Sequence, residues 1–159
     1  MASNKPSKEK ILVADDEVPM RELLERVLAP EGYAILHASD GKEALNQTLS
    51  HRPDLILLDV RMPKLDGVTL CKALRVYKET CTIPIIIITA FGSHERLEEG
   101  MAAGADDFIA KPFDPLELKI RVRAMLKLKH VHDEVARLQQ YIVSLREARG
   151  ESPEPPKTD

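Results

Sequence analysis

The sequence has few aromatic residues, few cysteines and no strong excess of charge of either sign. Aromatic residues make up 4% of the 159 positions, and the only cysteines are Cys71 and Cys81. Two distant cysteines form neither a disulfide framework nor a close metal-binding pair, so we expect small buried hydrophobic residues in a reducing compartment. The net charge of −3 gives the whole chain no electrostatic drive toward nucleic acid or anionic lipid.

Long apolar runs are also missing. The longest, from Ile83 to Ala90, contains Pro84 and is far shorter than the roughly 20 residues that cross a bilayer. The N-terminal segment, MASNKPSKEK, has no apolar stretch of the kind found in signal peptides. We therefore expect a cytoplasmic protein that makes no contact with a membrane.

Short apolar runs alternate with amphipathic segments through most of the chain. The runs are apolar at successive positions rather than at every second one, which indicates parallel strands buried on both faces. Alternating strands and helices predict a doubly wound α/β fold, in which a five-stranded parallel sheet has helices on both faces. The expected strands are Lys10–Ala14, Ala34–Ala38, Leu55–Leu58, Ile83–Thr89 and Asp107–Ala110.

Helix start signals follow the first strand and each later one. The first helix is predicted at about Pro19 to Leu28, with proline in its first turn and Gly32 after its end. Short polar side chains that cap helix N-termini precede the later helices. These residues are Asp40, Asp66, Ser93 and Asp114.

The last helix continues beyond the α/β domain with the pattern of a coiled coil. Apolar residues recur at alternating spacings of three and four, which is typical of a coiled-coil seam. An isolated helix would leave this seam in water, so it should pair with a second copy, fold back on the domain or meet another protein. We favour a homodimer through this helix. The seam residues are Leu128, Val131, Val135, Leu138, Ile142 and Leu145.

These patterns divide the chain into four segments. We expect a flexible N-terminus at 1–8, the α/β domain at 9–128, the helical extension at 129–148 and a disordered tail at 149–159. The last helix of the α/β domain is basic, which makes nucleic acid a competing partner. A basic helix face is more often solvated or a docking surface, and no motif that reads base edges follows it. Specific DNA binding is therefore not expected.

Carboxylates follow two of the expected strands. Ligands of open α/β sheets bind beyond the carboxyl ends of the strands, where Asp15, Asp16 and Asp59 are found. If the first and third strands are neighbours, the three carboxylates converge, and their mutual repulsion favours a divalent cation. An all-oxygen site with open positions suits Mg²⁺, or the similar Mn²⁺, whereas the lack of Cys and His argues against zinc.

The fourth and fifth strands end in a hydroxyl and an ammonium group, at Thr89 and Lys111. A metal, a lysine and a hydroxyl donor around one carboxylate would stabilise a phosphoryl group during its transfer to that carboxylate. Asp59 is the candidate nucleophile. Its acyl phosphate would be hydrolysed again, so the phosphorylation would be temporary. Each residue alone has an ordinary structural interpretation, as a cap, turn, strand or surface residue. Their joint occurrence at one end of the sheet favours a functional site.

The chain resembles the CheY-like receiver domains of two-component response regulators. The motifs that carry the resemblance are LVADDE, LILLDVRMPKLDG, IIIITA and AGADDFIAKPF, and it covers roughly residues 9–128. The flavodoxin-like strand order 2-1-3-4-5 is carried over from this family. By the resemblance, Asp59 is the phospho-acceptor, and the metal ligands are Asp15, Asp16, Asp59 and the backbone carbonyl of Arg61.

The resemblance assigns roles to four further residues. Thr89 would hydrogen-bond the phosphoryl group and Lys111 would pair with it, which makes both catalytic. A cis peptide bond is expected between Lys111 and Pro112. Thr89 and Phe108 take the positions of the family's conformational switch. A phenylalanine ring has no hydroxyl, so only its burial or exposure can report the state of the site.

The implied function is that of a phospho-accepting response regulator. It would take a phosphoryl group from a histidine kinase or phosphotransfer protein and signal through altered contacts with a downstream protein. It would not be an enzyme beyond its own phosphorylation and slow dephosphorylation. An aspartyl-phosphate phosphohydrolase by resemblance carries a second aspartate two residues after the nucleophile, where Arg61 stands here. A degenerate receiver that acts as a dimerisation or scaffold module is the other alternative.

Overall fold

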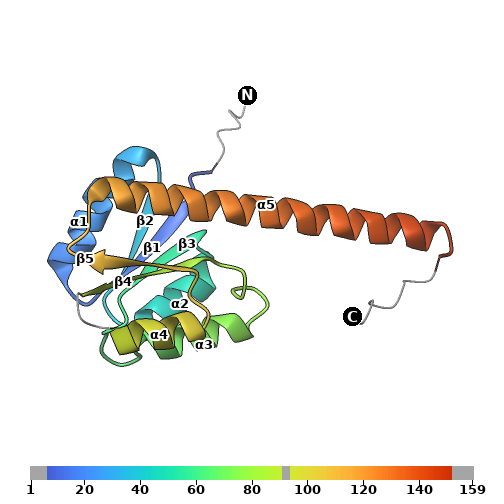
Figure 1. The fold of residues 1–159 in the computed structure, drawn as a ribbon. Helices are drawn as coiled ribbons and strands as arrows, with labels where there is room; N and C mark the ends of the chain where they lie inside the picture. The colour runs from blue at the N-terminus through green and yellow to red at the C-terminus, as the bar shows by residue number, and fades with distance from the viewer. Residues whose placement is uncertain (1–6, 91–93, 152–159) are drawn as a thin grey trace. The chain divides into compact units, whose positions relative to one another are not determined.

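Five parallel strands form one sheet in the computed structural model, which describes residues 7–90 and 94–151. The strand order β2-β1-β3-β4-β5 confirms the predicted order and fold class (Figure 1). The strands are β1 (Lys10–Ala14), β2 (Ala34–Ala38), β3 (Leu55–Leu58), β4 (Ile85–Ala90) and β5 (Asp107–Lys111). The helices are α1 (Val18–Leu28), the 3-10 turn η1 (Ala29–Glu31), α2 (Gly41–His51), α3 (Gly67–Val76), α4 (His94–Ala102) and α5 (Pro115–Ala148).

Apolar side chains on the two faces of the sheet form two separate cores. Leu12 and Ile56 belong to the core under α2, α3 and α4, whereas their neighbours Ile11 and Leu55 belong to the core under α1 and α5. Successive side chains of a strand point to opposite faces, so a strand covered on both faces must be apolar throughout. The central strand β3 is accordingly buried at every position.

Aspartate side chains cap α2 and α3, as the sequence predicts. Asp40 Oδ1 accepts a hydrogen bond from the amide of Glu43 at 2.8 Å, and Asp66 Oδ1 accepts one from the amide of Thr69 at 2.9 Å. Each cap satisfies an amide that has no partner within its own helix. Ser93, the predicted cap of α4, lies outside the described residues.

Strand β4 begins later than predicted, at Ile85 rather than Ile83. Pro84 has no N–H to donate to a neighbouring strand, so regular pairing starts only after it. At their other ends, β4 and β5 each extend one residue beyond the prediction. The two added residues, Ala90 and Lys111, pair with each other.

The two cysteines differ in burial. Cys71 is fully buried in the core under α3, and burial raises the pKa of its thiol to about 11. A thiol of this kind is a poor nucleophile at neutral pH. Cys81 was predicted to be buried as well, but it is only partly so, because it lies in the connection between α3 and β4.

The chain divides into two compact units, residues 1–126 and 127–159. The first contains the sheet and the second contains the C-terminal part of α5. Within the second unit, every described residue is exposed except Lys129, which is partly buried. None of the described helices is both long and apolar enough to cross a membrane. The predicted flexible N-terminus and disordered tail lie largely outside the described residues.

The guanidinium group of Arg75, in the last turn of α3, joins the segments that precede β4 and β5. It donates to the carbonyl oxygens of Cys81 at 3.1 Å and Ile83 at 2.6 Å. It also donates to the carbonyl oxygen of Gly104 at 2.7 and 2.9 Å and pairs with Asp106 at 2.9 Å. These contacts use the planar fork of five N–H donors that only arginine offers.

Replacing Arg75 with methionine should lower the free energy of unfolding by about 2–4 kcal/mol, because carbonyl groups and a carboxylate lose their partner. Urea unfolding followed by circular dichroism measures this loss. The matched control is Arg96→Met, which removes an exposed arginine whose ion pair with Glu99 spans one turn of α4. The control should change the stability by less than about 0.5 kcal/mol. Equal losses in both variants would contradict the role given to Arg75.

Candidate functional site

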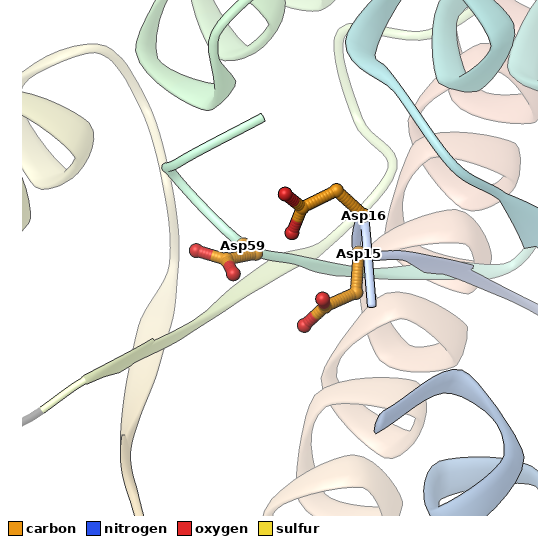
Figure 2. A group of neighbouring side chains, drawn as sticks. All are labelled: Asp15, Asp16 and Asp59. Atoms are coloured by element: carbon orange, nitrogen blue, oxygen red, sulfur yellow. The ribbon is translucent and has the colours of Figure 1, made fainter. Parts of the chain in front are cut away.

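The carboxyl ends of β1 and β3 bring three aspartates together (Figure 2). The two strands are parallel neighbours, with Ala14 paired to Leu58, and the amide of Asp59 donates to the carbonyl of Ala14 at 2.9 Å. The residues that follow these strand ends are Asp15, Asp16 and Asp59. One carboxylate oxygen from each lies within 4.8 Å of those of the others. The structure therefore brings these three predicted ligands into one cluster.

Lys111, at the end of β5, bridges two of these aspartates. Its Nζ donates to Asp15 Oδ2 at 2.9 Å and to Asp59 Oδ2 at 3.2 Å. The side chains of Lys111, Asp59 and Asp15 are only 17%, 12% and 2% exposed, whereas Asp16 is exposed. The cluster contains three carboxylates and this one ammonium group, so it has an excess of negative charge.

Burial and neighbouring charges shift the pKa values at this site. Burial raises the pKa of the Asp59 carboxyl above the usual aspartate value, and the charge of Asp15 adds to the rise. The Arg61 amide and the Lys111 ammonium lower that pKa without cancelling the rise. Burial alone would lower the pKa of Lys111, but its hydrogen bond to Asp15 and the charge of Asp59 leave it above the usual lysine value. The ammonium form of Lys111 is therefore favoured.

The donor set of the cluster fits a hard divalent cation. The group consists of three carboxylates and includes neither cysteine nor histidine. Mg²⁺ prefers oxygen ligands, and it takes only a few of them from the protein because it keeps several of its bound waters. Arg61 was expected to add its backbone carbonyl. Its amide donates to Asp59 Oδ1 at 3.0 Å, so the backbone at this position lies beside the cluster.

The two remaining residues to which the resemblance assigns catalytic or switch roles lie on β4 and β5. Thr89 pairs with Ala110, next to the pair formed by Ala90 and Lys111, which places it at the same end of the sheet as the lysine. Thr89 is 5% exposed, whereas Phe108 is 41% exposed. The peptide bond from Lys111 to Pro112 is cis.

Two residues that shape the site were missed by reasoning from the sequence. Arg21, on α1, donates from its guanidinium to the carbonyl oxygen of Asp15 at 2.7 Å. Gly67 packs so tightly that a Cβ added to it would lie 2.8 Å from the carbonyl oxygen of Asp59. The Asp-Gly step at the start of α3 is a turn signal that points to Gly67. Arg21 has no such signal, because its contact depends on the packing of α1 beside β1.

Comparison with known sequences identifies relatives of the first unit. Residues 11–123 match the sequence profile of the response regulator receiver domain. The probable transcriptional regulator ycf27 of Guillardia theta is 45% identical over 121 residues, which are 76% of this chain and 46% of ycf27. The chain thus spans about half the length of the curated relatives it matches.

Solved structures share the same fold. Chemotaxis protein CheY4 of Vibrio cholerae has a TM-score of 0.70 at 34% identity, covering 75% of this chain and 99% of that one. The receiver domain of the sensor histidine kinase PA1611 from Pseudomonas aeruginosa PAO1 has a TM-score of 0.72 at 30% identity, covering 76% and 99%. That receiver domain holds a magnesium ion in its active-site cleft.

Replacing Asp16 with asparagine should weaken Mg²⁺ binding by about tenfold or more, because one charge is removed within a few ångströms of the cation. The matched control is Glu17→Gln, which removes the same charge from an exposed neighbour outside the cluster. A Mg²⁺ titration followed by amide chemical shifts gives both affinities. Equal weakening in the two variants would show that only the general charge of the region matters.

Without divalent metal, Asp59→Asn should raise the thermal unfolding midpoint at pH 7. The pKa of Asp59 is raised in the folded protein, so ionisation of this carboxyl costs stability. The loss of stability is complete at a pH above the pKa of Asp59 in the folded protein. It is absent at a pH below the pKa of aspartate in the unfolded chain. The stability gained by Asp59→Asn should therefore vanish as the pH falls below about 4. Melting curves in EDTA at several pH values measure it, with Asp133→Asn on exposed helix as control. A gain that grows toward acid pH would contradict this assignment.

Proposed function

The chain belongs to the response regulator receiver domain family, and we propose that it accepts a phosphoryl group on Asp59 from a histidine kinase or phosphotransfer protein. The observation that supports this most directly is the aspartate cluster bridged by Lys111 at the carboxyl ends of the parallel strands. Ligand sites of open α/β sheets lie at this edge. The whole activity, including the donor and the dependence on Mg²⁺ or Mn²⁺, is part of the proposal.

Asp59 supplies the attacking oxygen in this reaction. A P–O bond forms to the carboxylate as the P–N bond of the donor phosphohistidine breaks, and the electron pair of that bond stays with the imidazole. The nucleophile must be ionised. The Arg61 amide and the Lys111 ammonium favour the ionised form, since both lower the pKa of Asp59 against the effect of burial.

Charge neutralisation is the main contribution of the other site residues. Mg²⁺ held by Asp15, Asp16 and Asp59, with the Arg61 carbonyl, would neutralise charge on the phosphoryl oxygens. Lys111 remains anchored to Asp15 when it pairs with the phosphoryl group, because its Nζ already donates to both carboxylates. Thr89 supplies a hydroxyl donor from the end of β4.

The output proceeds through protein contacts in this proposal. Thr89 and Phe108 act as the switch, in which the exposed ring of Phe108 packs inward when the hydroxyl of Thr89 turns toward the phosphoryl group. The changed surface would be read by a downstream protein. Specific DNA binding and turnover of a separate substrate are not part of the proposed role. We also propose that the chain forms a homodimer through its C-terminal helix. The free thiols of Cys71 and Cys81 are consistent with a reducing compartment, so we propose a cytoplasmic location.

Incubation with acetyl phosphate and Mg²⁺ should add the mass of one phosphoryl group to the wild type and nothing to Asp59→Asn. The reason is that asparagine retains the shape of the side chain but lacks the nucleophilic carboxylate. Intact-mass spectrometry reads the result, with Asp133→Asn as a control that should be labelled like the wild type. No gain by the folded wild type would favour the degenerate receiver, and labelling of Asp59→Asn would place the acceptor elsewhere.

A further inference from the structure

The C-terminal helix has an exposed apolar seam along one side. Within the second unit, the seam residues named from the sequence, from Leu128 to Leu145, are between 41% and 60% exposed. All of them lie within α5, which continues to Ala148. A helix in a protein gains most of its stability from the packing of its apolar side, so we expect the seam to pack against a partner.

The spacing of the seam defines its heptad positions. Leu128, Val135 and Ile142 recur every seven residues, and each is followed three residues later by another apolar residue. The first set therefore occupies a positions and the second set occupies d positions. The d residues are Val131, Leu138 and Leu145.

The residue types in two of the three heptads indicate the number of helices. In the second and third heptads, β-branched Val135 and Ile142 stand at a, and Leu138 and Leu145 stand at d. Among parallel coiled coils this combination favours two strands, whereas isoleucine at both positions, or leucine at a with isoleucine at d, favours three or four. The first heptad, with Leu128 at a and Val131 at d, has the reverse arrangement. We propose that the helix forms a parallel, in-register, two-stranded coiled coil with the same helix of a second copy of this chain. The proposal deepens the proposed homodimer and is independent of phosphoryl transfer.

A second copy of the chain fits the seam, because each layer of the coiled coil would then be formed by two identical residues. In a parallel, in-register pair, every a residue meets its own counterpart and so does every d residue. All six layers are then apolar, and none buries an unpaired polar group or charge. Residues of equal size meet in every layer, which allows close packing of knobs into holes.

The flanking positions also tolerate parallel pairing. Each g residue of one helix then faces the e residue five positions later on its partner. The resulting pairs are Lys127 with His132, Glu134 with Gln139, and Tyr141 with Arg146. None opposes two acidic or two basic side chains while the histidine is uncharged, and the last pair can form a cation–π contact. Both copies would enter the coiled coil from the same end.

Disulfide crosslinking of the 159-residue chain tests the direction of pairing. In a Cys81→Ser background, Leu128→Cys and Leu145→Cys place a thiol at either end of the seam, separated along the helix by about 25 Å. Parallel pairing brings each thiol next to its own counterpart. Each variant alone should crosslink about tenfold or more faster than Gln140→Cys, whose thiol lies on the outer side of the helix. The background protein itself should not crosslink.

Sedimentation velocity tests whether a second copy is the occupant. The wild type should sediment as a dimer, and the double variant Leu138→Lys and Ile142→Lys should sediment as a monomer, because charges would be buried in two layers. The matched control is Val143→Lys, which makes the same replacement at an exposed valine outside the seam. This control should remain a dimer.

Three results would overturn the proposal. A wild type that sediments as a monomer would show that a second copy of the chain does not cover the seam. Crosslinking only in a mixture of Leu128→Cys and Leu145→Cys would show antiparallel helices. Equally fast crosslinking of Gln140→Cys would show that collisions, not a seam, join the chains. Acetyl phosphate labelling of the same variants keeps the two proposals separate, since loss of labelling with retained crosslinks would refute phosphoryl acceptance alone.

Discussion

The adjacency of β1 and β3 is the constraint on which the site depends. Because these strands are parallel neighbours in the middle of the sheet, their carboxyl ends lie side by side and place Asp15, Asp16 and Asp59 in one cluster. Carboxylates so close together repel one another and lose part of their hydration. The ammonium group of Lys111, delivered by the edge strand β5, offsets only part of this cost. The remaining negative charge favours a divalent cation at this edge.

The rest of the first unit keeps this edge in place. Two apolar cores hold helices over both faces of the sheet, so each strand end lies at a defined position. Arg75 joins the segments before β4 and β5 far from the carboxylates, and Gly67 allows the backbone after β3 to pack closely. In contrast, Phe108, on β5, is 41% exposed.

Most of the fold could be predicted from the sequence, because buried parallel strands and aspartate caps have local signals. The start of β4 was misplaced because the apolar run continues through Pro84, and only pairing reveals where the strand begins. The aspartate cluster was predictable from strand ends once β1 and β3 were taken as neighbours. The contacts of Arg21 and Arg75 were not, since each joins segments whose proximity exists only after folding. The spacing of residues along the sequence does not indicate which partners these two arginines contact.

The proposed function depends on acceptance of the phosphoryl group by Asp59. Treatment with borohydride reduces an aspartyl acyl phosphate to homoserine and leaves free carboxylates unchanged, so peptide sequencing by mass spectrometry can locate the modified residue directly. After incubation of the wild type with a phosphodonor and Mg²⁺, we expect homoserine at position 59 and at no other aspartate. Homoserine at Asp15 or Asp16, or none in a folded protein that binds Mg²⁺, would contradict it.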